Sequence, residues 1–444
     1  MTKPFAIIPA AATIRLANAR VPADLLAGDV PLRARDGLVA CDIDIAGGCI
    51  AAISAPGTIP VAPETVTVDL QKSMALPRFV DMHTHIDKGH IVARSPNPDG
   101  THHGARATVG ADRDARWSAD DVATRMDFAL RCAYAHGTGA LRTHIDSIGK
   151  QTGISWPVLA QMRTSWKDRI AIQAVALFPT LFAVDDEAQF KSIVATVAKH
   201  GGQLGGLTFM GDAPDAKLHL ALDRTFAAAA ANSLDLDFHV DESDSPHATT
   251  LEAVADAALR ARFKGRITAG HCCRLSLETD ADRQRIINKL GEARIAVVSL
   301  PMCNMYLQDR APVRTPRWRG VAPLHELDAA GIAVAVASDN TRDPFYAYGD
   351  LDMLEVFREA TRIIHFDHAP KPWTRMLSAA PAAIMGLADA SRITVGQAAD
   401  LVLVRARTLN ELNTRPQADR IVLVGGSAID TSLPDYRELD TPTG

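Results

Sequence analysis

The chain has few cysteines and little excess charge for its 444 residues. Its six cysteines are too few for a disulfide scaffold, and no two of them form a Cys-x-x-Cys pair, which excludes a zinc knuckle or a thioredoxin-like motif. The simplest interpretation is that they are free thiols in a reducing compartment. The formal net charge is only −5, so the basic surface typical of nucleic-acid binding is not expected.

Long apolar runs and export signals are also missing from the sequence. No uninterrupted apolar run approaches the roughly 20 residues of a membrane helix. The short apolar run near the N-terminus contains Pro9 and leads into an Arg-bearing segment without a clear cleavage site. Hydrophobic residues make up 47% and charged residues 22%, which excludes a disordered chain and a highly charged coiled coil. We therefore expect a cytoplasmic globular protein without a membrane or nucleic-acid partner.

The two ends of the chain predict short strands. ATIRLANARV, ACDIDIA and CIAAIS near the start, and ITVGQAADLVLVRA and RIVLVGG near the end, are rich in Ile, Val and Ala and are separated by Gly and Pro. Neither end shows a strong helical period. We therefore predict that residues 1–75 and 391–444 together form one small β-sandwich domain.

The middle of the chain, residues 76–390, alternates between short apolar runs and longer helical stretches. Near-continuous apolar runs are typical of parallel strands that are buried on both faces. Eight such runs predict an α/β fold, a (β/α)₈ TIM-type barrel. The spacing Ser245-Pro246 predicts the start of one of the intervening helices. The polar segments 87–116 and 302–320 are predicted to be long loops that act as lids at the carboxyl ends of the strands. The predicted strands span residues 76–83, 139–146, 170–177, 205–210, 234–240, 265–271, 295–301 and 332–339.

Five polar residues stand at the carboxyl ends of predicted strands, where barrel active sites are built. They are His83, His85, His239, His271 and Asp339. His83 and His85 are two residues apart, so both imidazoles point to the same side of a strand. A lone His-x-His is weak evidence for a metal, but the joint placement of four histidines and an aspartate at strand ends favours one. Imidazole and carboxylate donors suit Zn²⁺ and Fe²⁺ alike.

Glu242 follows His239 by three residues and is predicted to face the mouth of the same pocket. Taken alone, such a glutamate is more often a solvated loop charge or an acid at a helix N-terminus. Beside a metal site, a carboxylate that is near the ion without binding it is suited to carry protons. We therefore interpret Glu242 as the proton shuttle of a hydrolytic reaction.

Several motifs together resemble the cytosine deaminase branch of the amidohydrolase superfamily, close to N-isopropylammelide hydrolase. They are HTHID, HVDE, GHCC and SDNTRDPFYAYGDLDM, with RTHID at 142–146 and NMYLQDR at 304–310. The resemblance spans almost the whole chain. It implies that His83, His85, His239 and Asp339 hold one divalent metal ion, that His271 hydrogen-bonds the metal-bound water and that Glu242 protonates a ring nitrogen. It also implies a homo-oligomer.

The resemblance implies a deamination mechanism. A metal lowers the pKa of bound water and supplies hydroxide, which attacks the ring carbon that carries the exocyclic amine. Asp339 takes a proton from the attacking water, and the intermediate then expels ammonia or an amine. Binuclear members of the superfamily carry a carboxylated lysine at the end of the fourth strand, whereas this chain reads GGLTFMGD there. A mononuclear site is therefore expected.

Four positions depart from the cytosine deaminase pattern. Thr180 replaces the glutamine that reads the pyrimidine amide, and Asn340 replaces a second aspartate. Phe345 replaces a tryptophan, and Lys88 replaces a small hydroxyl residue. A threonine hydroxyl lacks the paired donor and acceptor of an amide. These substrate-binding positions predict the same aminohydrolase reaction on a small nitrogen heterocycle other than cytosine.

Two alternatives stay open. One is an amidohydrolase that releases an alkylamine or opens a cyclic amide, which the altered pocket allows. The other is a non-catalytic scaffold, which is the least favoured because every expected ligand and Glu242 are present. The arginines of the two predicted lids, among them Arg94, Arg106 and Arg314, are expected to be solvated or paired with aspartates, the alternative being contact with an anionic substituent.

Overall fold

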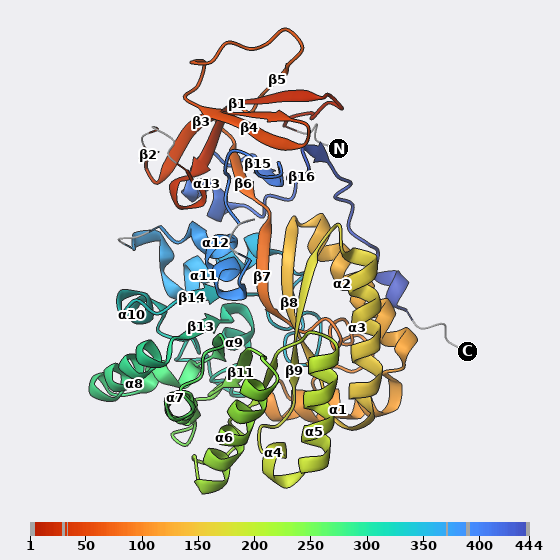
Figure 1. Cartoon of the computed structure of the whole chain (residues 1–444), viewed down its shortest axis with the longest axis vertical. Coiled ribbons are helices and arrows are strands. Elements are labelled where there is room, and N and C mark those ends of the chain that lie inside the picture. The colour runs from red at the N-terminus through yellow and green to blue at the C-terminus, as the bar shows by residue number, and fades with distance from the viewer. Residues whose placement is uncertain (1–4, 29–31, 33, 370–371, 388–390, 441–444) are drawn as a thin grey trace. The chain divides into compact units, whose positions relative to one another are not determined.

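The computed structural model describes residues 5–28, 32, 34–369, 372–387 and 391–440 (Figure 1). The chain divides into two compact units. One comprises residues 1–80, 132–139 and 352–433, and the other comprises residues 81–131, 140–351 and 434–444. The predicted boundary at residue 390 lies outside the described residues. None of the helices in the described part of the chain combines the length and the apolar character that a bilayer crossing requires.

Both ends of the chain contribute strands to one nine-stranded sheet. Its order is β17-β16-β15-β6-β1-β3-β2, with β4 paired to β3 and β5 paired to β1. Alternating apolar side chains, such as Leu16, Ile43 and Leu403, are fully buried in its core. The strands are β1 (Thr13–Pro22), β2 (Ala34–Arg35), β3 (Leu38–Ala46), β4 (Cys49–Ser54), β5 (Val66–Asp69), β6 (Met74–Pro77), β15 (Leu401–Val404), β16 (Ile421–Val424) and β17 (Ser427–Ala428).

Eight further strands match the eight predicted runs. β7, β8 and β9 form one sheet, and β10 to β14 form a parallel sheet of five. Parallel bridges between Val175 and Gln203 and between Thr84 and Asp339 join the two sheets at both edges, so the strands close into a ring. The predicted α/β fold is therefore confirmed. The strands are β7 (Phe79–Thr84), β8 (Thr138–Asp146), β9 (Ala171–Leu177), β10 (Leu204–Leu207), β11 (Leu236–Val240), β12 (Ile267–His271), β13 (Ile295–Ser299) and β14 (Val334–Val336).

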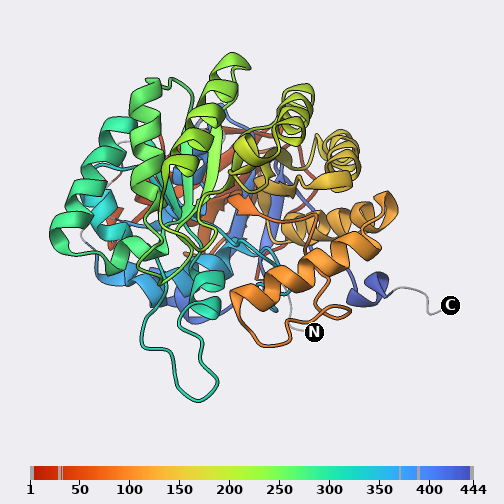
Figure 2. The ribbon, with the colours of Figure 1, turned by 90° about the horizontal axis from the view of Figure 1, so that it is seen from below.

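Helices α1 to α10 occupy the connections between these strands, whereas α11 to α13 follow β14. Figure 2 shows the helices of the orange-to-green part of the chain on the outside of the strands. The helices are α1 (His102–Arg116), α2 (Ala119–Ala135), α3 (Thr152–Trp166), α4 (Phe182–Asp185), α5 (Glu187–Lys199), α6 (Ala216–Ala231), α7 (Thr250–Ala261), α8 (Asp280–Ala293), α9 (Pro301–Leu307), α10 (Leu324–Ala329), α11 (Met353–Ile364), α12 (Ala379–Met385) and α13 (Leu409–Thr414).

Three local predictions were wrong. The first six residues of the predicted lid loop 302–320 belong to helix α9, which starts at Pro301, a residue suited to the first turn of a helix. The helix predicted to start at Ser245-Pro246 begins at Thr250, because the buried Asp241 carboxylate accepts the backbone N–H groups of Thr250 and Leu251 at 2.9 Å each. The second half of the predicted lid loop 87–116 is helix α1. The Thr101 side chain caps this helix by accepting the N–H of Gly104.

Candidate active site

The predicted metal-binding residues come together at one end of the ring of strands. His83 lies in β7, His239 lies in β11 and His271 ends β12, while His85 and Asp339 follow β7 and β14. The bridge between Thr84 and Asp339 places the two flanking segments side by side. All five side chains are buried. The fold therefore brings distant parts of the sequence to a single point, as the spacing predicted.

The distances between the donor atoms suit one small cation. Asp339 Oδ1 lies 3.1 Å from His85 Nε2 and 3.5 Å from His83 Nε2. His85 Nε2 and His239 Nε2 lie 3.2 Å apart. Four donors at about 2.1 Å from a tetrahedral ion are separated by about 3.4 Å. These three separations are close to that spacing, and His83, His85 and His239 also offer donor atoms that all lie within 4.8 Å of one another.

The hydrogen bonding of these residues supports the same interpretation. Among the described residues, both ring nitrogens of His83 and both carboxylate oxygens of Asp339 make no hydrogen bond, although they are buried. Buried polar atoms without partners are rare and require an explanation. Burial also lowers the pKa of His83, His85 and His239 well below 6.5, so the imidazoles are neutral and offer lone pairs. The donor set fits a divalent cation.

Two of the site residues have a left-handed backbone. The φ angles are 69° at His271 and 67° at Asp339. Such a conformation costs a non-glycine residue on the order of 1–3 kcal/mol and is found mostly at functional sites. Here it turns both side chains toward the other donors.

Glu242 is anchored beside His271 by groups from three segments. Its Oε1 accepts a hydrogen bond from Asn304 Nδ2 at 3.1 Å, and Asn304 Nδ2 also faces His271 Nδ1 at 2.9 Å. Its Oε2 lies 3.4 Å from His102 Nε2. Burial alone would raise the pKa of Glu242, but His271 and His102 outweigh it and the net shift is downward. The carboxylate is therefore ionised and able to accept a proton.

The Asn304 contact also determines the tautomer of His271. The amide donates its two hydrogens to Glu242 and to His271 Nδ1, so Nδ1 is the acceptor and the proton of the neutral ring is on Nε2. His271 Nε2 makes no hydrogen bond within the described residues and is buried. A donor is thus available beside the four predicted ligands. In the sequence, Asn304 is recognisable only as part of the motif NMYLQDR.

A group of buried polar side chains lies directly next to the predicted ligands. The His144 ring is 4.0 Å from the His83 ring and 4.5 Å from the His239 ring, measured between centroids. Arg142 NH1 donates to Asp237 Oδ2 at 2.8 Å, and both side chains are almost completely buried. The sequence analysis noted RTHID as a motif but assigned no role to Arg142, His144 or Asp237. The strand pattern could have identified them. Arg142 and His144 are two residues apart in β8, and Asp237 is two residues before His239 in β11, so each pair points to one side of its strand.

A cavity of about 200 Å³ opens next to this cluster. Three of the four predicted substrate-binding residues, Lys88, Asn340 and Phe345, line it together with His85, His239, Glu242 and His271. Lys88 is buried, pairs with Asp146 at 2.9 Å and lies 5.6 Å from the centre of the Phe345 ring. Thr180, the fourth predicted residue, is fully buried and is not among the described residues that line the cavity.

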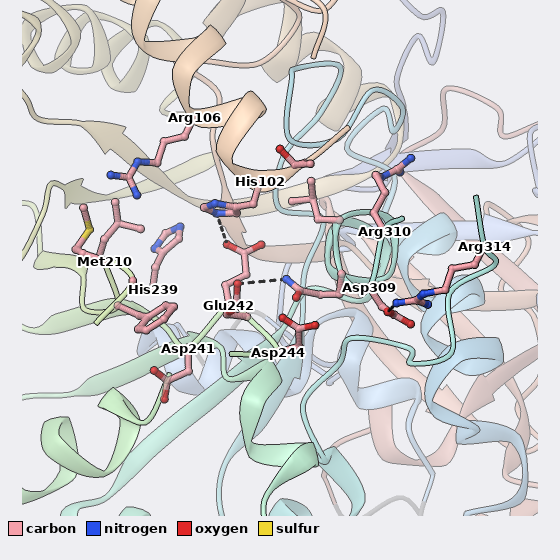
Figure 3. A pocket seen from close by; sticks show the side chains of 17 residues that line it. His102, Arg106, Met210, His239, Asp241, Glu242, Asp244, Asp309, Arg310 and Arg314 are labelled. Atoms are coloured by element: carbon pink, nitrogen blue, oxygen red, sulfur yellow. Dashed lines mark hydrogen bonds and ion pairs between the residues drawn. The ribbon is translucent and has the colours of Figure 1, made fainter. Parts of the chain in front are cut away.

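A second cavity of about 360 Å³ shares His102, Arg106, His239 and Glu242 with the first (Figure 3). Arg310 and Arg314 lie on its other side. Most lid arginines are paired, as expected. Arg94 bridges Asp112 and Asp121, and Arg314 pairs with Asp309.

Comparisons with known proteins place this geometry in a family. Residues 129–427 match the amidohydrolase family. The chain belongs to this family. Over 444 residues it is 52% identical to a pterin deaminase from Rhizobium rhizogenes strain K84, with 100% of each chain covered. It is 24% identical over 395 residues to an N-isopropylammelide isopropyl amidohydrolase from Pseudomonas sp. strain ADP, covering 86% of this chain and 91% of the relative.

The fold also resembles a solved structure. A 5-methylcytosine deaminase from Klebsiella pneumoniae, liganded with 5-fluorocytosine, superposes with a TM-score of 0.76 and 21% identity over 95% of this chain and 98% of that chain. The predicted resemblance is therefore confirmed. The chain is a metal-dependent hydrolase that acts on a carbon–nitrogen bond of a cyclic amidine, as the motifs predicted.

Proposed function

We propose that this amidohydrolase removes the exocyclic amino group of a pterin with a single divalent metal ion. The observation that carries the substrate class is the 52% identity to a pterin deaminase over the full length of both chains. The reaction consumes one water, replaces the C–NH₂ group of the ring with C=O and releases ammonia. The altered cytosine-reading positions support a substrate other than cytosine.

The metal ligands in this proposal are His83, His85, His239 and Asp339. Their buried, unpartnered donor atoms support the assignment. A bound divalent ion, Zn²⁺ or Fe²⁺, would supply a hydroxide nucleophile at neutral pH and act as a Lewis acid. The neutral imidazoles and the small separations between donors favour a mononuclear site, and the chain carries no lysine at the end of β10.

Three side chains would accept, donate or transfer the protons of the reaction. Asp339 would accept a proton from the attacking water through its carboxylate. His271 would donate its Nε2–H to the attacking oxygen, because Asn304 holds the other ring nitrogen as an acceptor. Glu242 would carry the proton to the ring nitrogen next to the reacting carbon and then to the departing amine. Its anchored carboxylate at the mouth of the site supports this role.

The cavity of about 200 Å³ would hold the heterocycle. Phe345 offers an aromatic face and Lys88 a buried cation, while Asn340 is held by a hydrogen bond from its Nδ2 to Asp343 Oδ2 at 2.6 Å. The second cavity, of about 360 Å³, adjoins this space and would leave room for a substituent on a bicyclic ring. Thr180 is fully buried and outside the described lining of this cavity, so its role in substrate binding stays a prediction.

The test is turnover of pterin by protein loaded with Zn²⁺ or Fe²⁺. Ammonia release and product mass are followed for pterin, cytosine and N-isopropylammelide, with Glu242→Gln as the inactive control. The proposal expects turnover of pterin, a product about one mass unit heavier and one ammonia per turnover. Release of an alkylamine, or a product about 18 mass units heavier from ring opening, would support the alternative and refute simple deamination.

The proposal also covers the domain architecture, the cellular location and the oligomeric state. We infer a β-sandwich domain from residues 1–75 and 391–444 and a (β/α)₈ barrel from residues 76–390, supported by the shared nine-stranded sheet and the ring of eight strands. A cytoplasmic location, a homo-oligomeric state and the lack of nucleic-acid or membrane partners stay predictions.

A further inference from the structure

His102 is the first residue of helix α1 and contacts the proposed proton shuttle. Its Nε2 lies 3.4 Å from Glu242 Oε2, and Figure 3 shows the imidazole directly against this carboxylate. His102 also lines both cavities. In the sequence, His102 is only one residue of the predicted lid segment 87–116, and nothing in the motif pattern connects residue 102 with residue 242.

The fold holds His102 in this place through its neighbours. Asn97 Nδ2 donates hydrogen bonds to the carbonyl oxygens of Thr101 and Pro344 at 3.0 Å each. The His102 ring meets the Phe345 ring edge to face, with centroids 5.3 Å apart. The first turn of α1 is thus tied to the segment that follows Asp339. The histidine reaches Glu242 from a supported helix start rather than from a free loop.

The two oxygens of Glu242 have different anchors. Asn304, on α9, holds Oε1 at 3.1 Å, and His102, on α1, faces Oε2. A carboxylate held at one oxygen only can rotate about its last bond. A shuttle that must meet a ring nitrogen needs a fixed direction, and a small misplacement in a catalytic site costs up to about 100-fold in rate.

We propose that His102 is a positioning residue that holds the Glu242 carboxylate in the orientation needed for proton transfer. This inference rests on the proposed function. The side chain of His102 is 36% exposed, so the pair contributes little to stability and its value lies in orientation.

The test compares His102→Leu, His102→Gln and the control His103→Leu. Gln retains an N–H donor at a similar reach, whereas Leu removes it. His103 is exposed, next in the same helix turn and absent from the lining of both cavities. The inference predicts that His102→Leu lowers kcat for pterin about 10-fold or more with KM changed less than about threefold. Gln restores most of kcat, and His103→Leu matches the unaltered protein.

A crystal structure of the metal-loaded His102→Leu protein provides a readout that does not depend on turnover. We expect the Glu242 carboxylate to leave its position or to occupy several rotamers there. If KM rises while kcat stays constant, His102 contacts the substrate instead and the inference is wrong. It is equally wrong if Gln is as slow as Leu, or if Glu242 keeps its position. Failure of the unaltered protein to deaminate pterin would refute the proposed function, while the crystal structure would still decide the role of His102.

Discussion

The buried ion pair between Arg142 and Asp237 allows a worked prediction. The exposed fractions of the two side chains are 1% and 0%, and NH1 donates to Oδ2 at 2.8 Å. Arg142→Met removes the cation and keeps most of the volume, which leaves a buried carboxylate without its partner. Breaking such a pair costs about 3–5 kcal/mol. Unfolding entropy is about 2.1 cal/mol/K per residue, or about 0.9 kcal/mol/K for this chain, so Tm should fall by roughly 3–5 °C.

The assay is differential scanning calorimetry of the single variants and of the double variant Arg142→Met with Asp237→Leu. Because replacing both partners removes the stranded charge, the double variant should recover much of the loss. Arg131→Ala, which breaks only partly exposed pairs with Asp127 and Glu438, serves as the control and should change Tm by less than about 1 °C. If Arg142→Met lowers Tm by less than about 1 °C, or if the double variant is less stable than Arg142→Met alone, the stranded charge is not the source of the loss.

Three further predictions concern charge and metal. Asp352 forms a bidentate pair with Arg420. Burial would raise the pKa of Asp352, but the pair with Arg420 outweighs burial and the net shift is downward. Asp352→Asn should therefore be less stable than the unaltered protein above pH ~4. The stabilisation is lost as pH falls through the lowered folded pKa, so thermal scans should show the two proteins converge below about pH 4, and a constant gap would contradict this origin. Glu242→Gln should lower kcat about 10²- to 10⁴-fold while elemental analysis finds unchanged metal content, and loss of the metal would contradict a shuttle role. A protein that is saturated at a free metal concentration of 100 Kd should lose about 2.7 kcal/mol of stability when a chelator removes the metal. The loss should appear as a lower Tm, and chelation should leave the Tm of His239→Asn unchanged. An equal decrease in Tm in that variant would place the metal elsewhere.

The sequence predicted the parts of the fold that depend on local pattern. Each of the eight apolar runs is a strand, because continuous Ile, Val and Ala suit strands covered on both faces. The helix predicted at Ser245-Pro246 begins later because a tertiary contact, from Asp241, sets its first residue. A cap supplied by a buried carboxylate outside the helix cannot be recognised from the Ser-Pro pair.

In the candidate site, too, the residues that follow from local pattern were predictable, and those that depend on tertiary contacts were not. The positions of His83, His239 and Asp339 were predictable because the carboxyl ends of the parallel strands meet at one end of the ring of strands. His102 and Asn304 were not, because their roles depend on where helices α1 and α9 lie relative to Glu242. The polar segment 87–101 gave no sign that α1 would bring an imidazole to the active site.

The proposed chemistry depends on one divalent ion held by His83, His85, His239 and Asp339. Elemental analysis of the purified protein, before and after His239→Asn, combined with pterin deamination by both, tests it most directly. The account predicts one metal ion per chain and pterin turnover, both lost in the variant. Two tightly bound ions per chain, or undiminished metal content and turnover in His239→Asn, would contradict it.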